Sequence, residues 1–268
     1  MGKTGNQEIG SYVSQTYVGV GSVVLGGSSQ TGIYPSQMGN PDLKWESTTQ
    51  YDVGLELGVL DGRINLKVDY YYKVTKDMLL DVPLPRSTTT GTAKMNYGSV
   101  ENKGWEFGLG AAIIDGANFK WNTDISISLN QNKILALGPT GAPIYVQTGA
   151  GNGTSILKVG EPIGAFFGLT RLGTYSTEEA SLAARYGMLP GDLKFLDRND
   201  DGKIDLYSDG GIIGYSFPKV LGGFNNYFKY KRFDASLNIQ FVSGVNKAFV
   251  HESAEDRQLV SGGLNSTL

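Results

Sequence analysis

Apolar and polar residues alternate with a period of two along several stretches of the chain. In residues 64–74, for example, Ile64 and Leu66 alternate with Asn65 and Lys67. The same alternation runs through 51–59, 105–113, 119–129 and 233–241, and more weakly through 9–18 and 224–230. Such alternation is typical of antiparallel strands in a sheet with one apolar and one polar face. The sequence therefore predicts an all-β protein with about seven such strands.

Short turns join these strands into hairpins whose apolar residues stay on one face. Asp61-Gly62 suits a type I′ turn, because both residues tolerate a positive φ, and this turn sets Val59 opposite Ile64. The other short turns, at 115–117 and 231–232, set Ile113 opposite Phe119 and Tyr230 opposite Phe233. A slip of one residue would move the apolar side chains to the other face, so the pattern predicts these registers.

The connections between the strands alternate in length. The short turns lie at 61–62, 115–117 and 231–232, whereas the long connections lie at 19–46, 75–97 and 130–218. Outer-membrane barrels have this asymmetry, with short periplasmic turns and long extracellular loops. The apolar stretches are about 9–11 residues long, which is the length that a tilted strand needs to cross hydrocarbon. We therefore predict part of an antiparallel transmembrane β-barrel, with odd-numbered residues outward except in 64–74, where even-numbered residues point out.

The segment 130–218 is predicted to form one large extracellular loop region. The strand before it runs outward and the strand after it runs inward, so an even number of crossings lies between them, most simply none. Within this segment, Ser176 is a suitable N-cap for a short helix that has Glu178 and Glu179 in its first turn. Gly187 is expected to end this helix.

Composition supports an all-β fold and excludes several functions. Glycine accounts for 38 of 268 residues and aromatic residues for 11%, which disfavours helices and favours strands. The net charge of −3 gives no indication of the basic surface that nucleic-acid binding requires. The chain has no cysteine and one histidine, so thiolate and multi-histidine metal sites are excluded, and His251 is interpreted as a polar loop residue. Neither a transmembrane helix nor an apolar signal-peptide core is recognised.

An acidic stretch in the long loop has the spacing of a calcium-binding loop. Acidic or amide oxygens occur at alternate positions, and Gly202 allows a sharp turn among them. The candidate ligands are Asp197, Asn199, Asp201, the carbonyl of Lys203, and Asp205 or Asp209. The final loop position is Ser208 instead of the usual glutamate. A structural Ca²⁺ site and a solvated acidic turn with local side-chain caps both fit this pattern.

Several strings of residues add a resemblance to this picture. Residues 40–46 read NPDLKWE and residues 96–106 read NYGSVENKGWE, each at the beginning of a predicted hairpin or strand. Further strings are GEPIGAFFG at 160–168, GDLKFLD at 191–197, NDDGKID at 199–205, IIG at 212–214 and GGFNN at 222–226. In this order they resemble the C-terminal half of SusC/RagA-like TonB-dependent outer-membrane transporters. The resemblance spans almost the whole chain.

The resemblance implies a barrel of about 22 strands that is filled by an N-terminal plug. It also implies an outer-membrane location in contact with lipid, a SusD-like surface lipoprotein as partner, energy supplied through TonB, and a glycan or peptide as cargo. No plug and no TonB-contacting segment are recognised in this sequence. We therefore expect a fragment of a transporter that does not import cargo alone and has no enzymatic activity.

Two alternatives remain open at this point. The first is a secreted calcium-binding β-sheet adhesin or carbohydrate-binding module, in which Trp105, Phe107 and Leu237 would be buried against a second sheet instead of contacting lipid. The second is a β-rich glycoside hydrolase, which needs a facing pair of carboxylates. Adjacent Glu178 and Glu179 do not face each other on a helix. On the inward face, charged residues would line a polar lumen or contact a plug: Asp52, Glu56, Lys67, Asp69 and Lys73.

Overall fold

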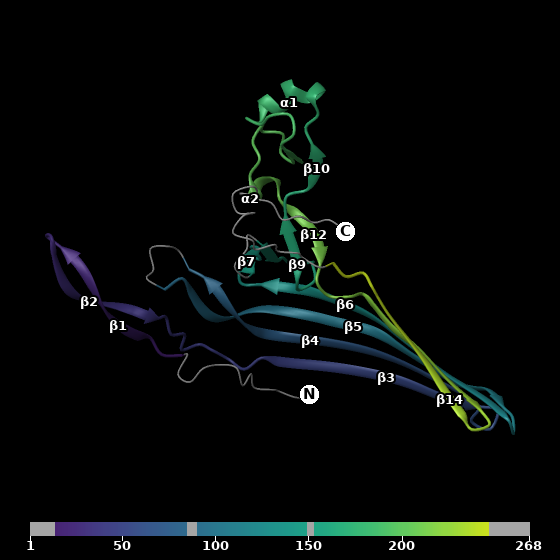
Figure 1. Cartoon of the computed structure of the whole chain (residues 1–268). Helices are drawn as coiled ribbons and strands as arrows, with labels where there is room; N and C mark the ends of the chain where they lie inside the picture. The colour runs from purple at the N-terminus through teal and green to yellow at the C-terminus, as the bar shows by residue number, and fades with distance from the viewer. Residues whose placement is uncertain (1–13, 85–89, 149–152, 247–268) are drawn as a thin grey trace. The chain divides into compact units, whose positions relative to one another are not determined.

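The computed structural model describes residues 14–84, 90–148 and 153–246 (Figure 1). The chain divides into two compact units. The first contains the residues up to Ile144, together with 158–161 and Val220–Val242, and the second contains Tyr145–Leu157, Pro162–Lys219 and the residues from Ser243 onward. His251 lies outside the described residues. Among the described residues, no helix has the length and apolarity needed to cross a membrane.

The first unit is built on a long sheet of six strands, here called the main sheet, with the order β14-β13-β6-β5-β4-β3. The strands are β3 Ser47–Val59, β4 Ile64–Pro83, β5 Thr92–Asp115, β6 Phe119–Leu137, β13 Val220–Tyr230 and β14 Phe233–Ser243. Strands β3 to β6 run side by side in Figure 1 and pair antiparallel. Every strand predicted from residue 51 onward lies within one of these elements, so the antiparallel all-β prediction is confirmed.

The register of the main sheet keeps the predicted apolar residues together. One row across the sheet consists of Leu55, Val68, Phe107, Ile127 and Gly222, each directly opposite the next. Directly opposed residues share a face, so the odd-numbered apolar positions and the even-numbered ones of 64–74 lie on the same side. The predicted pairing of Val59 with Ile64 is also present. In the turn between them, Leu60 joins Asp61 and Gly62 in having a positive φ.

The predicted register of the second hairpin is wrong, because β5 contains a β-bulge. Ile113 does not lie opposite Phe119, because the register between β5 and β6 shifts between Ala112 and Ile114. Asp115 then pairs with Lys120, and their side chains form an ion pair at 2.6 Å. The bulge accommodates one additional residue on β5, which a pattern of strict alternation does not reveal.

The predicted long connections are mostly regular structure. The connection 75–97 shrinks because β4 continues to Pro83 and β5 already begins at Thr92, with register shifts near Met78. Likewise, β6 continues to Leu137. Here apolar side chains are covered by other parts of the chain, and Val100, Ile134 and Leu137 are buried. Strand pairing thus extends beyond the alternating stretches that the sequence predicts to cross the membrane.

The connection predicted at 19–46 contains a hairpin. Strands β1 Tyr17–Leu25 and β2 Ser28–Gln37 pair antiparallel in a two-stranded sheet of their own. Residues 9–13 of the predicted strand 9–18 lie outside the described residues, and the remainder does not join the main sheet. The main sheet therefore has six strands in the described residues, and the weakly predicted strand 9–18 is not one of them.

The second unit contains short strands and helical turns. A sheet with the order β12-β9-β8-β7 is formed by β7 Ile144–Thr148, β8 Gly153–Leu157, β9 Ala165–Gly168 and β12 Gly211–Tyr215. A separate pair consists of β10 Arg171–Thr174 and β11 Leu193–Phe195. The core beneath the larger sheet contains Ile156, Ala165 and Phe167. Where the sequence predicts a helix, a 3-10 turn at Thr177–Glu179 leads into α1 Ala180–Arg185, and a second short helix, α2, spans Leu206–Asp209.

Candidate functional site

The face of the main sheet opposite the apolar rows is polar and carries the charged residues predicted to point inward. A representative row consists of Glu56, Lys67, Gly108, Ser126 and Gly223. The Nζ atom of Lys67 lies 3.4 Å from a carboxylate oxygen of Glu56 and 3.7 Å from one of Asp69. Asp52 and Lys73 share this face, since they pair with Tyr71 and Gln50 on the neighbouring strands. The sheet therefore presents a wall with one apolar and one polar surface.

Glycine keeps the polar face flat where an aromatic ring crosses it. A Cβ atom at Gly104 would lie 2.7 Å from the ring of Tyr71 and 2.5 Å from the carbonyl oxygen of Leu129. Because there is no side chain at Gly104, the ring of Tyr71 lies across the strand, and its hydroxyl donates to the Oδ1 atom of Asn130 at 2.7 Å. Gly104 thus has a specific packing role on the polar face.

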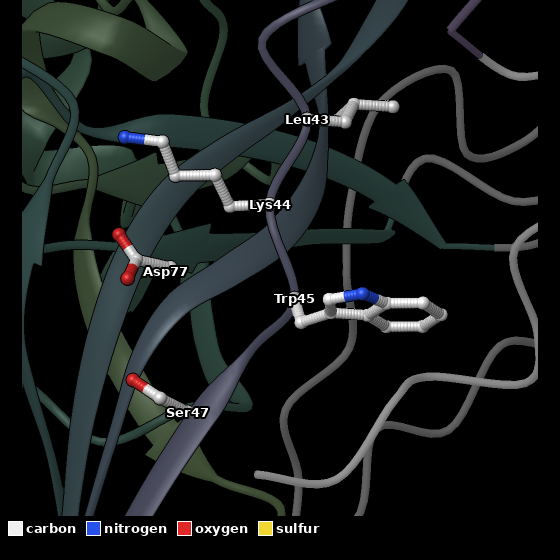
Figure 2. Close-up of a pocket in the computed structure, with 5 residues that line it drawn as sticks. All are labelled: Leu43, Lys44, Trp45, Ser47 and Asp77. Carbon is white, nitrogen blue, oxygen red and sulfur yellow. The ribbon is translucent and has the colours of Figure 1, made fainter.

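A second polar feature is a pocket of about 360 Å³ at the beginning of β3 (Figure 2). The backbone N–H and carbonyl of Lys44 both bond to the side-chain amide of Asn96 at 2.8 Å. The same amide donates to the carbonyl of Asp77 at 2.7 Å. Figure 2 shows the side chains of Leu43 and Trp45 on one side, with those of Lys44 and Asp77 on the other. These hydrogen bonds join residues 40–46 to residues 96–106, which are two of the segments that carry the family resemblance. They attach the start of β3 to β4 and β5.

The acidic loop in the second unit is organised by its own side chains. One oxygen of Asp197, Oδ2, accepts the N–H of Gly202 at 3.0 Å and the hydroxyl of Tyr186 at 3.2 Å. Asn199 accepts the N–H of Asp201 at 3.1 Å, and Asp201 accepts the N–H of Lys203 at 2.8 Å. These bonds fold residues 197–203 into successive tight turns.

Asp205 and Asp209 accept hydrogen bonds from backbone N–H groups in and after these turns. Asp205 caps α2, because its Oδ1 atom accepts the N–H groups of Tyr207 and Ser208. Asp209 is fully buried, and its carboxylate accepts the N–H groups of Arg198 at 2.9 Å and Asp205 at 2.8 Å. These backbone donors hold the pKa of the Asp209 carboxyl below its usual range, despite the opposing effect of burial.

The acidic loop fits a cation in one respect. The second carboxylate oxygen of Asp197, Oδ1, is buried and has no hydrogen-bond partner. A buried carboxylate oxygen without a donor is costly, and a bound cation would satisfy it. Among the described residues, however, no group of three or more His, Asp or Glu side chains is arranged to hold a metal. The fit therefore rests on Asp197 and Asp201 together with amide and carbonyl oxygens, and not on a cluster of carboxylates.

The Glu178–Glu179 pair has a structural explanation. The carboxylate of Glu179 accepts the N–H of Ser176 at 3.1 Å and bonds to Nζ of Lys194. The ammonium group of Lys194 and the N–H of Ser176 both lower the pKa of the Glu179 carboxyl. Glu179 thus closes the first turn of the helical segment and is not available as one of two facing carboxylates.

The chain matches the family described as "TonB dependent receptor-like, beta-barrel" over residues 9–249. The TonB-dependent receptor P26 of Formosa agariphila is 37% identical over 246 residues, which cover 91% of this chain and 25% of that protein. The TonB-dependent receptor SusC of Bacteroides thetaiotaomicron is 33% identical over 209 residues, which cover 75% of this chain and 20% of SusC. The chain therefore spans about a quarter or less of the length of these relatives.

Solved structures agree with the fold. The RagAB peptide importer in its open-open state matches 91% of this chain and 25% of its own chain, with a TM-score of 0.70 and 24% identity. The closed-closed state of the same importer gives a TM-score of 0.68. From the extent of the family match and the identity to its members, the chain belongs to the TonB-dependent receptor β-barrel family of outer-membrane proteins, in which it is similar to SusC.

Proposed function

We propose that this chain forms part of the wall of an outer-membrane importer for glycans or peptides. The importer would take up cargo with the help of a SusD-like surface lipoprotein and use energy supplied through TonB. Similarity to SusC and the fold shared with a peptide importer support this proposal over a secreted adhesin, a carbohydrate-binding module or a glycoside hydrolase.

The observation that carries the proposal is the exposure of the apolar rows. Trp105 is 46% exposed and Leu237 is 52% exposed, although both belong to the apolar face of the main sheet. Near the long connections of the same sheet, Val100 and Ile134 are 4% and 1% exposed. The exposed apolar residues of this sheet need an apolar environment outside the described residues, and bilayer hydrocarbon provides one.

Uptake measurements test this proposal. Cells that contain the complete gene product should accumulate labelled oligosaccharides or labelled peptides, and deletion of the gene should abolish uptake of one class. Removal of TonB should have the same effect as deletion, because the energy for import comes through it. Uptake that persists at the same rate without TonB would contradict the proposed energy coupling.

We also propose that the acidic loop binds a structural Ca²⁺ ion. Asp197, Asn199 and Asp201 would supply side-chain oxygens, and Lys203 would supply its carbonyl. The buried, unpartnered Oδ1 atom of Asp197 supports this assignment. When bound, the ion would offset the repulsion between the carboxylates and hold the turns of residues 197–203 together.

Calcium should protect this loop from proteolysis. The loop lacks a glutamate at its final position, so we expect a Kd of about 10⁻⁴–10⁻³ M, in the range of extracellular modules. Asp201→Ala should abolish the protection, because it removes a ligand. Asp200→Ala should retain it, because Asp200 is exposed and pairs with Arg185 at 3.0 Å. Identical cleavage rates in calcium and in chelator for the unmodified protein would rule out the calcium site.

A further inference from the structure

We propose that one face of the β1–β2 hairpin is the docking surface for the surface lipoprotein, through an uncharged apolar contact. The inference rests on the proposed function, which includes that partner. The docking face consists of Val18, Val20, Val24 and Ile33, which are 66%, 69%, 75% and 75% exposed. Four aliphatic side chains held at this exposure on one short hairpin form a surface that another protein would cover.

The register of the hairpin places these residues on one side. Val20 lies directly opposite Ile33, and Val18 and Val24 occupy alternate positions on the same strand. Opposed and alternate residues share a face of a β-ribbon. The docking face therefore runs from the base of the hairpin to a point close to its turn, with Ser22 and Thr31 between its aliphatic residues.

The other face of the hairpin is partly covered by its own tyrosine. Tyr34 lies opposite Gly19, and a Cβ atom at either Gly19 or Gly21 would approach the Tyr34 ring to 2.9 Å. The two glycines thus allow the ring to lie flat on that side. The ring covers this face at Gly19 and Gly21, whereas Val23 and Leu25 beyond it are 43% and 65% exposed.

The surroundings of the docking face carry no charge. The sequence contains no Asp, Glu, Lys or Arg between Glu8 and Asp42. Exposed strands in monomeric proteins usually carry charges that prevent association, and this hairpin has none. A partner surface that fits it must itself be apolar and uncharged at the contact, because a charge buried there would have no counterion.

The base of the hairpin is fixed to the main sheet. The N–H of Gly39 donates to the hydroxyl of Thr16 at 3.1 Å, which closes the two ends of the hairpin. Asn40 then donates to the carbonyl of Lys94 at 3.3 Å, and Met38 forms a bridge with Ala93 on β5. The hairpin is therefore presented on an anchored base instead of a free linker.

The place of the hairpin in the chain selects the lipoprotein over lipid. The hairpin leads into the beginning of β3, at the end of the main sheet opposite the short turn 60–63. If the short turns are periplasmic, as barrel architecture predicts, the hairpin lies on the extracellular side, where the lipoprotein is located. Lipid is a poor partner, because a two-stranded hairpin has open backbone edges that hydrocarbon cannot satisfy.

A pair of matched double variants in the complete gene product tests this inference. Val20→Glu with Ile33→Lys replaces the apolar pair by opposite charges that still attract across the strands. Val23→Glu with Gln30→Lys makes the same change at a directly opposed pair on the other face. We measure copurification of the lipoprotein and its Kd in detergent, and check barrel assembly of each variant in the outer membrane.

The first variant should weaken lipoprotein binding by at least about tenfold, and the second by less than about threefold. Binding by the unmodified protein should change little as the salt concentration rises, since the contact has no charges. If the unmodified protein forms the complex and both variants bind the lipoprotein with equal affinity, the docking face is wrong. The proposed function would not be affected by that result. Absence of any lipoprotein from the unmodified complex would overturn the proposed function as well. Crosslinking of the hairpin to a second copy of the chain would assign the face to self-association and overturn the inference.

Discussion

Replacing Leu237 with arginine should prevent most of the complete gene product from assembling in the outer membrane. Leu237 lies on β14 among the apolar residues of the main sheet and is 52% exposed. If this face contacts lipid, an arginine near the bilayer midplane costs about 2–4 kcal/mol. A cost of that size is a large part of the stability of an ordinary domain. The measurement is the amount of folded, heat-modifiable barrel in outer-membrane fractions.

The neighbouring residue provides the matched control. Ser236 precedes Leu237 on the same strand, so its side chain points to the opposite, polar face. Ser236→Arg should therefore assemble far better than Leu237→Arg, although the two differ by one position only. Equal yields of the two variants would refute the assignment of the apolar face to lipid.

The main sheet could be predicted because the alternation of apolar and polar residues that it requires is visible within each strand. A strand between lipid and a polar lumen must alternate apolar and polar residues, as 64–74 does, and each short turn fixes which residues face each other. The row from Leu55 through Phe107 to Ile127 follows from this requirement alone. The bulge at Ala112–Ile114 was missed because one additional residue leaves the alternation on both sides intact.

The β1–β2 hairpin was missed for a different reason. Its glycines and serines resemble a polar connection, and the strand signal of Val18 and Val20 is interrupted by Gly19 and Gly21. Those glycines make room for the ring of Tyr34 on the opposite strand. The sequence of β1 alone does not show that contact. The extensions of β4 and β5 were missed for a similar reason, because their apolar residues are covered by distant parts of the chain.

The acidic loop shows how far residue type alone can define a site. Spacing placed six polar residues in one segment, from Asp197 to Asp209, but it could not show where each oxygen points. The structure directs the carboxylate of Asp209 to backbone N–H groups and leaves one oxygen of Asp197 without a donor. These directions depend on the path of the backbone between Arg198 and Asp205, which no short motif specifies.

Asp209→Asn should open the acidic loop. The asparagine has the same shape, but its amide group has one acceptor oxygen, whereas the carboxylate has two. The buried amide would place an N–H group against the N–H of either Arg198 or Asp205, and a buried donor without an acceptor is costly. We expect proteolysis within residues 196–210 to become faster by about tenfold or more. Asp205→Asn is the control, because asparagine is also a good N-cap and the residue is exposed.

The same carboxylate should make the loop sensitive to acid. Because the pKa of Asp209 is lower in the folded loop than in an unfolded chain, its ionised form stabilises the loop above the unfolded value of about 3.9. That stabilisation is lost as the pH falls from there through the lower pKa of the folded state. Hydrogen exchange of the N–H groups of Arg198 and Asp205 should therefore accelerate, relative to the intrinsic rate at each pH, as the pH falls below about 4. In Asp209→Asn this acceleration should be much smaller, because residue 209 no longer titrates. An acid transition of equal size in both proteins would show that another group controls the loop.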